Sequence, residues 1–129
     1  MSTVEQQISE EIQKAISGNE VILFMKGTPD APRCGFSART VAVLEALGKP
    51  FAAVDILPDP RIRQQLSELS HWPTIPQLFV NGELIGGADI VAEMYESGEL
   101  AEVLGVARQP GAVPEGDANA PLTIENRLN

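Results

Sequence analysis

Apolar residues in the first part of the chain recur every three or four positions over residues 4–17, and Gly18 follows directly. This spacing predicts an amphipathic helix that ends at the glycine. The next apolar stretch, VILFMK at residues 21–26, lacks polar alternation, which predicts a strand buried on both faces. Residues 27–33 contain two prolines and a glycine and are therefore predicted to form a loop.

The same alternation of helix and strand patterns continues along the chain. Helical spacing returns over residues 34–47, and the run FAAVDI at residues 51–56 predicts a second strand. A third helix is predicted over residues 59–70, because Asp59 suits the cap position and Pro60 the first helical position.

A β-hairpin is the clearest local prediction. Two apolar runs within residues 77–87 flank Asn81-Gly82, the residue pair that best forms a tight hairpin turn. Residues 88–104 return to helical spacing, with an interruption near Gly98.

The predicted order of elements is α-β-α-β-α-β-β-α. A strand–helix–strand unit requires a right-handed crossover and a parallel strand pair, whereas the hairpin adds two antiparallel neighbours. The sequence therefore predicts an α/β fold with a four-stranded mixed sheet and helices on both faces. This domain spans residues 1–106. Residues 107–129 contain three prolines, two glycines and few large apolar residues, which predicts a flexible tail.

Composition narrows the class of function. The chain has 129 residues, a net charge of −9 and one cysteine. A negative field of this size disfavours nucleic acid and anionic membranes as partners. One cysteine permits no internal disulfide, and neither a secretory signal nor an apolar run long enough to span a membrane is visible, so we expect a cytoplasmic protein.

The single cysteine, Cys34, is the first candidate for chemistry. It falls where the loop meets the second helix, and the unpaired N–H groups and dipole of a helix start stabilise a thiolate. Lys26 and Arg33 are placed to add positive charge. A buried, inert cysteine is the alternative, but a proline-rich loop and polar neighbours favour a reactive thiolate. Ser37 lies one helical turn on, where a second thiol would complete a redox pair.

Two other positions leave alternatives open. In WPTIPQLFV, the bond between Ile75 and Pro76 is a candidate for cis, which would turn the Ile75 backbone outward to pair with a peptide. Spacing alone favours trans, because only about one X–Pro bond in twenty is cis. The glycines and aspartate of GGAD, residues 86–89, suit an anion-binding helix start, or equally a turn in which Asp89 caps its own helix. Trp72 is predicted to be a packing residue.

Three motifs together resemble a known family. KGTPDAPRCGFSA, WPTIPQLFVNGELIGGADI and the order of elements are similar to the monothiol glutaredoxins of the CGFS type. The resemblance covers residues 4–106 and implies the thioredoxin-like fold and glutathione binding. It also implies a cis Ile75-Pro76 bond, against the expectation from spacing.

The resemblance also implies residue roles. Ile75, beside Pro76, would pair with the cysteinyl unit of glutathione, and Phe36 would lie beside the sulfur. Lys26 and Arg63 would hold the glycine carboxylate of glutathione. The helix start at Ala88 and Asp89 would hold its γ-glutamyl end. The family often carries Cys or Ser at the position of Ala88, so only a backbone contact is implied there.

The implied function is iron–sulfur cluster transfer. Family members hold a [2Fe–2S] cluster between two subunits through one cysteine, here Cys34, and one glutathione from each chain. A homodimer, a BolA-like protein and apo iron–sulfur proteins are the implied partners. A glutathione-dependent oxidoreductase with Cys34 as nucleophile is the alternative, and a redox-sensing adaptor is a third. The loop at residues 27–33 favours the carrier with weak or no enzymatic activity, because the family associates this insertion with poor oxidoreduction.

Overall fold

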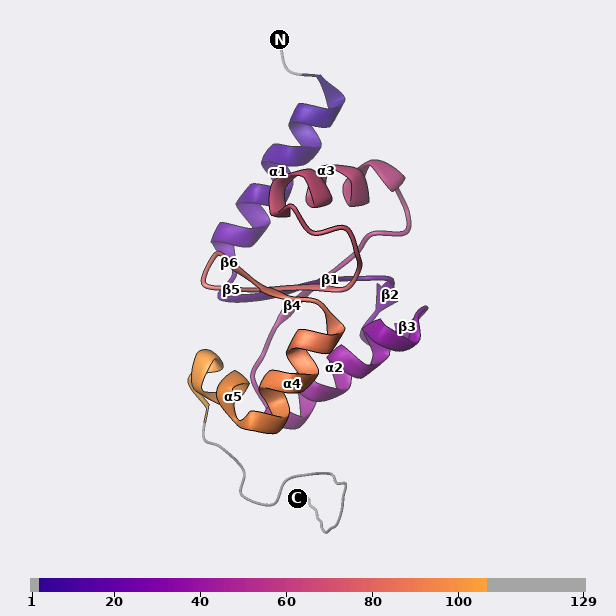
Figure 1. The fold of residues 1–129 in the computed structure, drawn as a ribbon. Coiled ribbons are helices and arrows are strands. Elements are labelled where there is room, and N and C mark those ends of the chain that lie inside the picture. The colour runs from indigo at the N-terminus through magenta and orange to yellow at the C-terminus, as the bar shows by residue number, and fades with distance from the viewer. Residues whose placement is uncertain (1–2, 107–129) are drawn as a thin grey trace.

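A four-stranded mixed sheet lies at the centre of the molecule, as predicted (Figure 1). In the computed structural model, which describes residues 3–106, the strand order is β4-β1-β5-β6. Strand β1 runs parallel to β4 and antiparallel to β5, and β5 pairs antiparallel with β6. The strands are β1 (Val21–Met25), β4 (Ala52–Asp55), β5 (Gln77–Val80) and β6 (Glu83–Gly86). The predicted tail lies outside the described residues.

Helices cover both faces of this sheet. Figure 1 shows α1 and α3 on one face and α2, α4 and α5 on the other. They are α1 (Val4–Gly18), α2 (Gly35–Leu47), α3 (Pro60–Ser70), α4 (Ala88–Ser97) and α5 (Glu99–Leu104). The predicted break near Gly98 is confirmed, since this glycine is left-handed (φ 86°) and separates α4 from α5. None of the helices within residues 3–106 has the length and apolarity needed to cross a membrane.

The core consists of two hydrophobic layers because all five residues of β1 are buried and alternate between the faces of the sheet. Val21, Leu23 and Met25 pack in the layer of α2, α4 and α5. Ile22 and Phe24 pack in the other layer, with residues of α1 and α3. The prediction that this strand is buried on both faces is therefore confirmed.

Local signals placed the turns and caps correctly. Asn81 and Gly82 both have positive φ (52° and 84°), as a type I′ hairpin turn requires. Asp59 caps α3 by accepting a hydrogen bond from the Arg61 N–H at 3.0 Å, and Pro60 occupies the first turn.

The segment before Cys34 is more ordered than the predicted loop. Residues Gly27–Thr28 (β2) and Ala31–Pro32 (β3) form a small antiparallel pair. The Arg33 N–H donates to the Lys26 carbonyl at 2.9 Å, which closes the segment at its base. Two-residue strands carry no periodic pattern, so the sequence indicated only a loop here.

Candidate functional site

Cys34 occupies the N-cap of α2 and is partly buried. Its pKa is lowered from the ordinary value, first by the N–H of Ser37 and then by the N–H of Phe36 and the charge of Lys26, while partial burial acts in the opposite direction. The predicted effect of a helix start on a thiolate is thereby confirmed. Arg33, which was also predicted to contribute, is not among the causes of the shift.

Ser37 fixes the start of α2 against the sheet. Its side chain is fully buried, and its hydroxyl oxygen accepts a hydrogen bond from the Lys26 N–H at 3.1 Å. The hydroxyl also contributes to the lowered pKa of Cys34. Ser37 therefore links the end of β1, which carries Lys26, to the helix turn that carries the thiol.

Asp55 fixes the other end of the segment before Cys34. Its Oδ1 accepts hydrogen bonds from the N–H groups of Gly27 at 2.9 Å and Leu57 at 3.0 Å. Because β1 and β4 are parallel, these groups meet at the carboxyl edge of the sheet. Lys26, which directly precedes Gly27, is held at this same edge.

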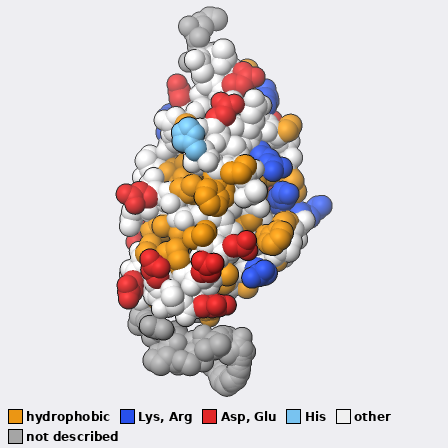
Figure 2. All heavy atoms as spheres, in the orientation of Figure 1, with side chains coloured by type: hydrophobic (Ala, Val, Ile, Leu, Met, Phe, Trp, Pro, Cys, Tyr) orange, Lys and Arg blue, Asp and Glu red, His pale blue; other side chains and the backbone are white. Residues whose placement is uncertain are grey.

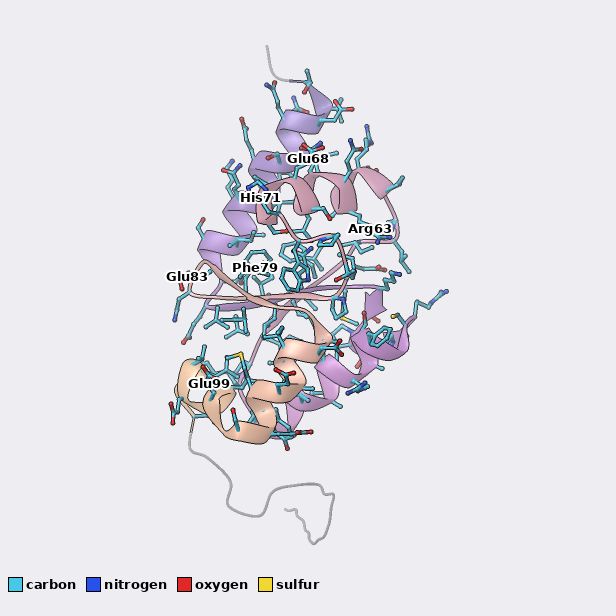
Figure 3. The ribbon with its side chains drawn as sticks, in the orientation of Figure 1. Arg63, Glu68, His71, Phe79, Glu83 and Glu99 are labelled. Atoms are coloured by element: carbon cyan, nitrogen blue, oxygen red, sulfur yellow. The ribbon has the colours of Figure 1, made fainter. Side chains whose placement is uncertain are left out.

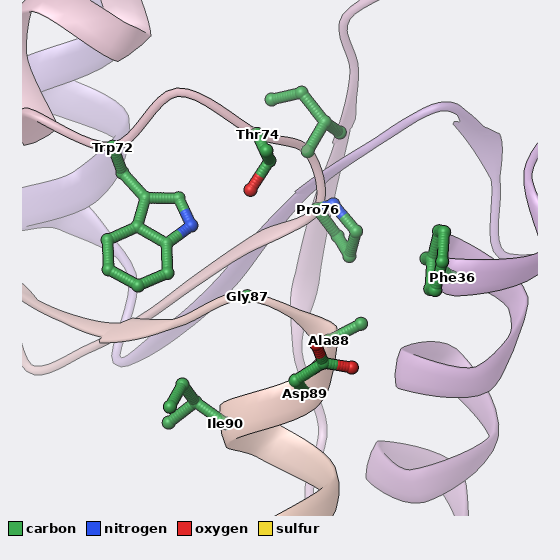
Figure 4. A pocket seen from close by; sticks show the side chains of 9 residues that line it. Phe36, Trp72, Thr74, Pro76, Gly87, Ala88, Asp89 and Ile90 are labelled. Atoms are coloured by element: carbon green, nitrogen blue, oxygen red, sulfur yellow. The ribbon is translucent and has the colours of Figure 1, made fainter.

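A groove of about 200 Å³ lies beside the start of α2 (Figure 4). Five of the predicted site residues line it: Phe36, Ile75, Pro76, Ala88 and Asp89. The groove is open enough to leave the Phe36 side chain 54% exposed. Its remaining lining residues are Gly87, which belongs to the GGAD motif, and Trp72, Thr74 and Ile90, which the sequence did not assign to the site.

The loop of residues 72–76 forms one wall of the groove. Its Ile75-Pro76 bond is cis, so the trans bond expected from spacing is wrong and the one implied by the resemblance is confirmed. The Ile75 side chain is buried in the core with α1 and α3. Within residues 3–106, no hydrogen bond uses the backbone N–H or C=O of Ile75. An anchored residue with free backbone groups can pair with an extended peptide.

The opposite wall is the start of α4. Gly87 is the N-cap, and Ala88 and Asp89 are the first two helical residues. Asp89 therefore does not cap its own helix, and that alternative is wrong. The N–H groups of this first turn lack partners within the helix, as at any helix start. A Cβ on Gly87 would lie 3.2 Å from Trp72 Nε1, so a glycine allows the loop and the helix to approach closely.

Three predicted site residues are not among those that line the groove: Cys34, Lys26 and Arg63. Cys34 lies two residues before Phe36, at the same helix start. Arg63 lies on α3 (Figure 3), where its Nη2 donates to the Pro73 carbonyl at 3.5 Å, which places it beside the 72–76 loop.

Unpaired positive charge is found at this site. The ion pairs within the described residues join Lys49 to Glu20 and Arg61 to Asp59, so neither Lys26 nor Arg63 has an acidic partner there. Figure 2 shows Lys and Arg side chains along one edge of the molecule. In a chain of net charge −9, such residues favour a ligand that carries carboxylates.

Some residues of the site were missed by sequence reasoning. Trp72 was assigned to packing but contributes to the groove, and Thr74 carried no signal of its own. Gln77 was overlooked, although a polar residue before the apolar run of β5 was a possible signal. It is fully buried, and its Nε2 donates to the carbonyls of Trp72 at 3.0 Å and Thr74 at 3.1 Å.

The sequence of the chain is similar to those of known glutaredoxins. The glutaredoxin family model matches residues 21–85. Glutaredoxin 4 of Escherichia coli (strain K12) is 54% identical over 95 residues, which cover 74% of this chain and 83% of the relative. A relative from Synechocystis described as an uncharacterized monothiol glutaredoxin is 52% identical over 96 residues, covering 74% of this chain and 90% of the relative.

Solved structures agree with the sequence relatives. Reduced poplar apo GrxS14 superposes with a TM-score of 0.69 at 47% identity, covering 76% of this chain and 90% of that one. A buckwheat glutaredoxin in complex with glutathione superposes with a TM-score of 0.71 at 23% identity, covering 81% and 94%, and shows the shared fold. The chain thus has the thioredoxin-like fold and belongs to the glutaredoxin family, and its relatives include proteins named glutaredoxin 4 and monothiol glutaredoxin.

Proposed function

We propose that this protein binds glutathione in the groove and, as a dimer, carries a [2Fe–2S] cluster that it transfers to apo iron–sulfur proteins. The observation that carries the proposal is a single thiol of lowered pKa beside a groove with free peptide groups at Ile75. The choice of glutathione and the need for two chains both follow from the residues around this groove.

Glutathione matches the chemistry of the groove and its surroundings. It is a tripeptide with two carboxylates and one thiol. The groove offers a peptide backbone at Ile75 and a helix start at Ala88, and Lys26 and Arg63, which lie outside its lining, add cations without an acidic partner within residues 3–106. Backbone pairing would orient the cysteinyl unit, and the charges would select the two carboxylate ends. The buckwheat complex supports the choice of ligand, since that protein shares the fold.

The number of ligands requires two chains. A [2Fe–2S] cluster is usually held by four thiolates. Cys34 is the only cysteine of the chain, and within residues 3–106 no group of three or more His, Cys, Asp and Glu residues is arranged to hold a metal. Two copies of Cys34 and two glutathione thiols supply four. Because half of the ligands are exchangeable tripeptides, a cluster held this way can be released to a recipient.

A glutathione-dependent oxidoreductase is the second candidate function, and the lowered pKa of Cys34 favours it. The thiolate would attack the sulfur of glutathione in a protein–glutathione disulfide and release the protein thiolate. A second glutathione would then restore Cys34 and leave as glutathione disulfide, so no second cysteine is required. The ordered β2–β3 segment before Cys34 corresponds to the insertion that favours the carrier.

Anaerobic reconstitution separates the two functions. The protein is mixed with iron, sulfide and glutathione, and its visible spectrum and mass in solution are recorded. The carrier predicts a coloured dimer that requires glutathione and is lost in Cys34→Ser. A colourless monomer that rapidly reduces a glutathione mixed disulfide would establish the oxidoreductase instead. A BolA-like protein and cytoplasmic apo-proteins are the partners that we propose for the loaded dimer.

A further inference from the structure

Gln77 is a buried polar side chain directly after the loop that forms one wall of the groove. It is 0% exposed, while the rest of β5 consists of the buried apolar residues Leu78, Phe79 and Val80. A buried carboxamide lowers stability unless its polar atoms are paired. A methionine would fill similar space without that cost, so the hydrogen bonds of Gln77 are the feature that distinguishes it.

Both hydrogen bonds of Gln77 go to the loop. Its Nε2 donates to the carbonyls of Trp72 at 3.0 Å and Thr74 at 3.1 Å. Both partners are acceptors, so only the NH₂ group of the carboxamide can face them. The Oε1 atom is buried and has no partner within residues 3–106. Within residues 3–106, the Gln77 side chain therefore makes only these two hydrogen bonds, and both go to the loop.

The two carbonyls belong to residues two positions apart, with Pro73 between them. This intervening carbonyl is not held by Gln77 but lies toward α3. The Pro73 carbonyl accepts from Arg63 there, and the Ile75 backbone remains free.

We propose that Gln77 is a positioning residue for glutathione: by holding two loop carbonyls inward, it presents the Ile75 backbone to the groove. Gln77 does not line the groove, so it acts through the loop. The inference rests on the proposed binding of glutathione at this site.

The test compares Gln77→Met, which keeps the approximate side-chain volume but removes the donors, with Val80→Ala on the same strand. Val80 is also buried, and its truncation destabilises the core without removing a bond to the loop. S-methylglutathione, which has no free thiol, is titrated by calorimetry into each folded variant. We expect roughly tenfold weaker binding in Gln77→Met and near-wild-type binding in Val80→Ala. Trp72, the single tryptophan, should also show a shifted emission in Gln77→Met.

Several outcomes would decide against the inference. Binding by Gln77→Met within about twofold of wild type would overturn it and leave the proposed function intact. Failure of the wild-type protein to bind S-methylglutathione would overturn the proposed function and, with it, the inference. Equal weakening in Val80→Ala would show a general effect of stability.

A second variant covers the case in which Gln77→Met does not fold. In Gln77→Glu the carboxylate repels both carbonyls, whereas the protonated acid can donate to one of them. Its affinity relative to wild type should therefore recover as the pH falls from about 7 to about 5. A ratio that stays near one throughout would overturn the proposal.

Discussion

Replacing Gly27 by alanine should strongly destabilise the protein, because two separate effects meet at this residue. Its φ is +88°, where a side chain is strained by about 1–2 kcal/mol. A Cβ would also lie 2.5 Å from the Ala31 carbonyl oxygen and 2.8 Å from the Arg33 nitrogen, both in the backbone. Forced overpacking typically costs about 1–3 kcal/mol, so the sum is about 2–5 kcal/mol.

Two other glycines separate these effects. Gly48 has a similar φ of +73° but open space around its Cβ, so Gly48→Ala should cost only the strain of about 1–2 kcal/mol. Gly18 has open space and no positive φ, so Gly18→Ala should change stability by less than about 0.5 kcal/mol. Urea unfolding followed by tryptophan fluorescence measures all three. A loss in Gly27→Ala no larger than that in Gly48→Ala would refute the close packing of the β2–β3 segment.

Three further substitutions test the thiol and its surroundings. Ser37→Ala leaves the Lys26 backbone N–H unpaired and should lower the free energy of unfolding by about 1–2 kcal/mol. The control Ser17→Ala, at an exposed position, should lower it by less than about 0.5 kcal/mol. Ser37→Ala should raise the pKa of Cys34 only slightly, because the backbone N–H at residue 37 remains. The rate of Cys34 alkylation as a function of pH measures this pKa, and a return to the ordinary thiol value would contradict the prediction. The lowered pKa of Cys34 also stabilises the fold above the pKa of the unfolded thiol, and this contribution is lost as the pH falls through the folded-state pKa. The difference in unfolding free energy between wild type and Cys34→Ser should therefore grow with rising pH, and a difference independent of pH would count against a stabilised thiolate. Lys26→Ala should weaken glutathione binding and shorten the lifetime of the cluster, whereas Lys14→Ala on α1 should change neither; an unchanged lifetime in Lys26→Ala would remove that residue from the site.

The sequence predicted those parts of the fold that depend on short-range patterns. The apolar run of β1 has no alternation because both of its faces are covered, and the Asn81-Gly82 turn depends on only two residues. The cap at Asp59 is equally local. Strand order then follows from connectivity, since a helical crossover gives a parallel pair and a tight turn gives an antiparallel one.

Parts of the site could not be predicted because they depend on contacts between distant segments. Asp55 bonds to Gly27 across 28 positions of sequence, and no pattern within β4 indicates that partner. The cis bond before Pro76 was inferred only from the resemblance, since local spacing favours trans. The position of Trp72 also follows from the approach of the α4 start to the loop, which depends on the whole fold.

In the part of the chain that the structure describes, every buried polar side chain hydrogen-bonds to a segment beside the site. Within residues 3–106 they are Ser37, Thr40 and Gln77. Ser37 accepts from the Lys26 N–H, Thr40 donates to the Phe36 carbonyl at 3.0 Å, and Gln77 donates to the loop of residues 72–76.

This distribution separates the groups that stabilise the fold from the groups that position the site. Apolar burial is non-directional and fixes the layers, whereas a hydrogen bond fixes the orientation of one backbone group. Conservative changes within the two apolar layers, other than at Ile75, should therefore lower stability and leave the groove unchanged in the folded protein. Changes at Ser37, Thr40 or Gln77 should instead alter the geometry around Cys34 and the groove, even in variants that remain fully folded.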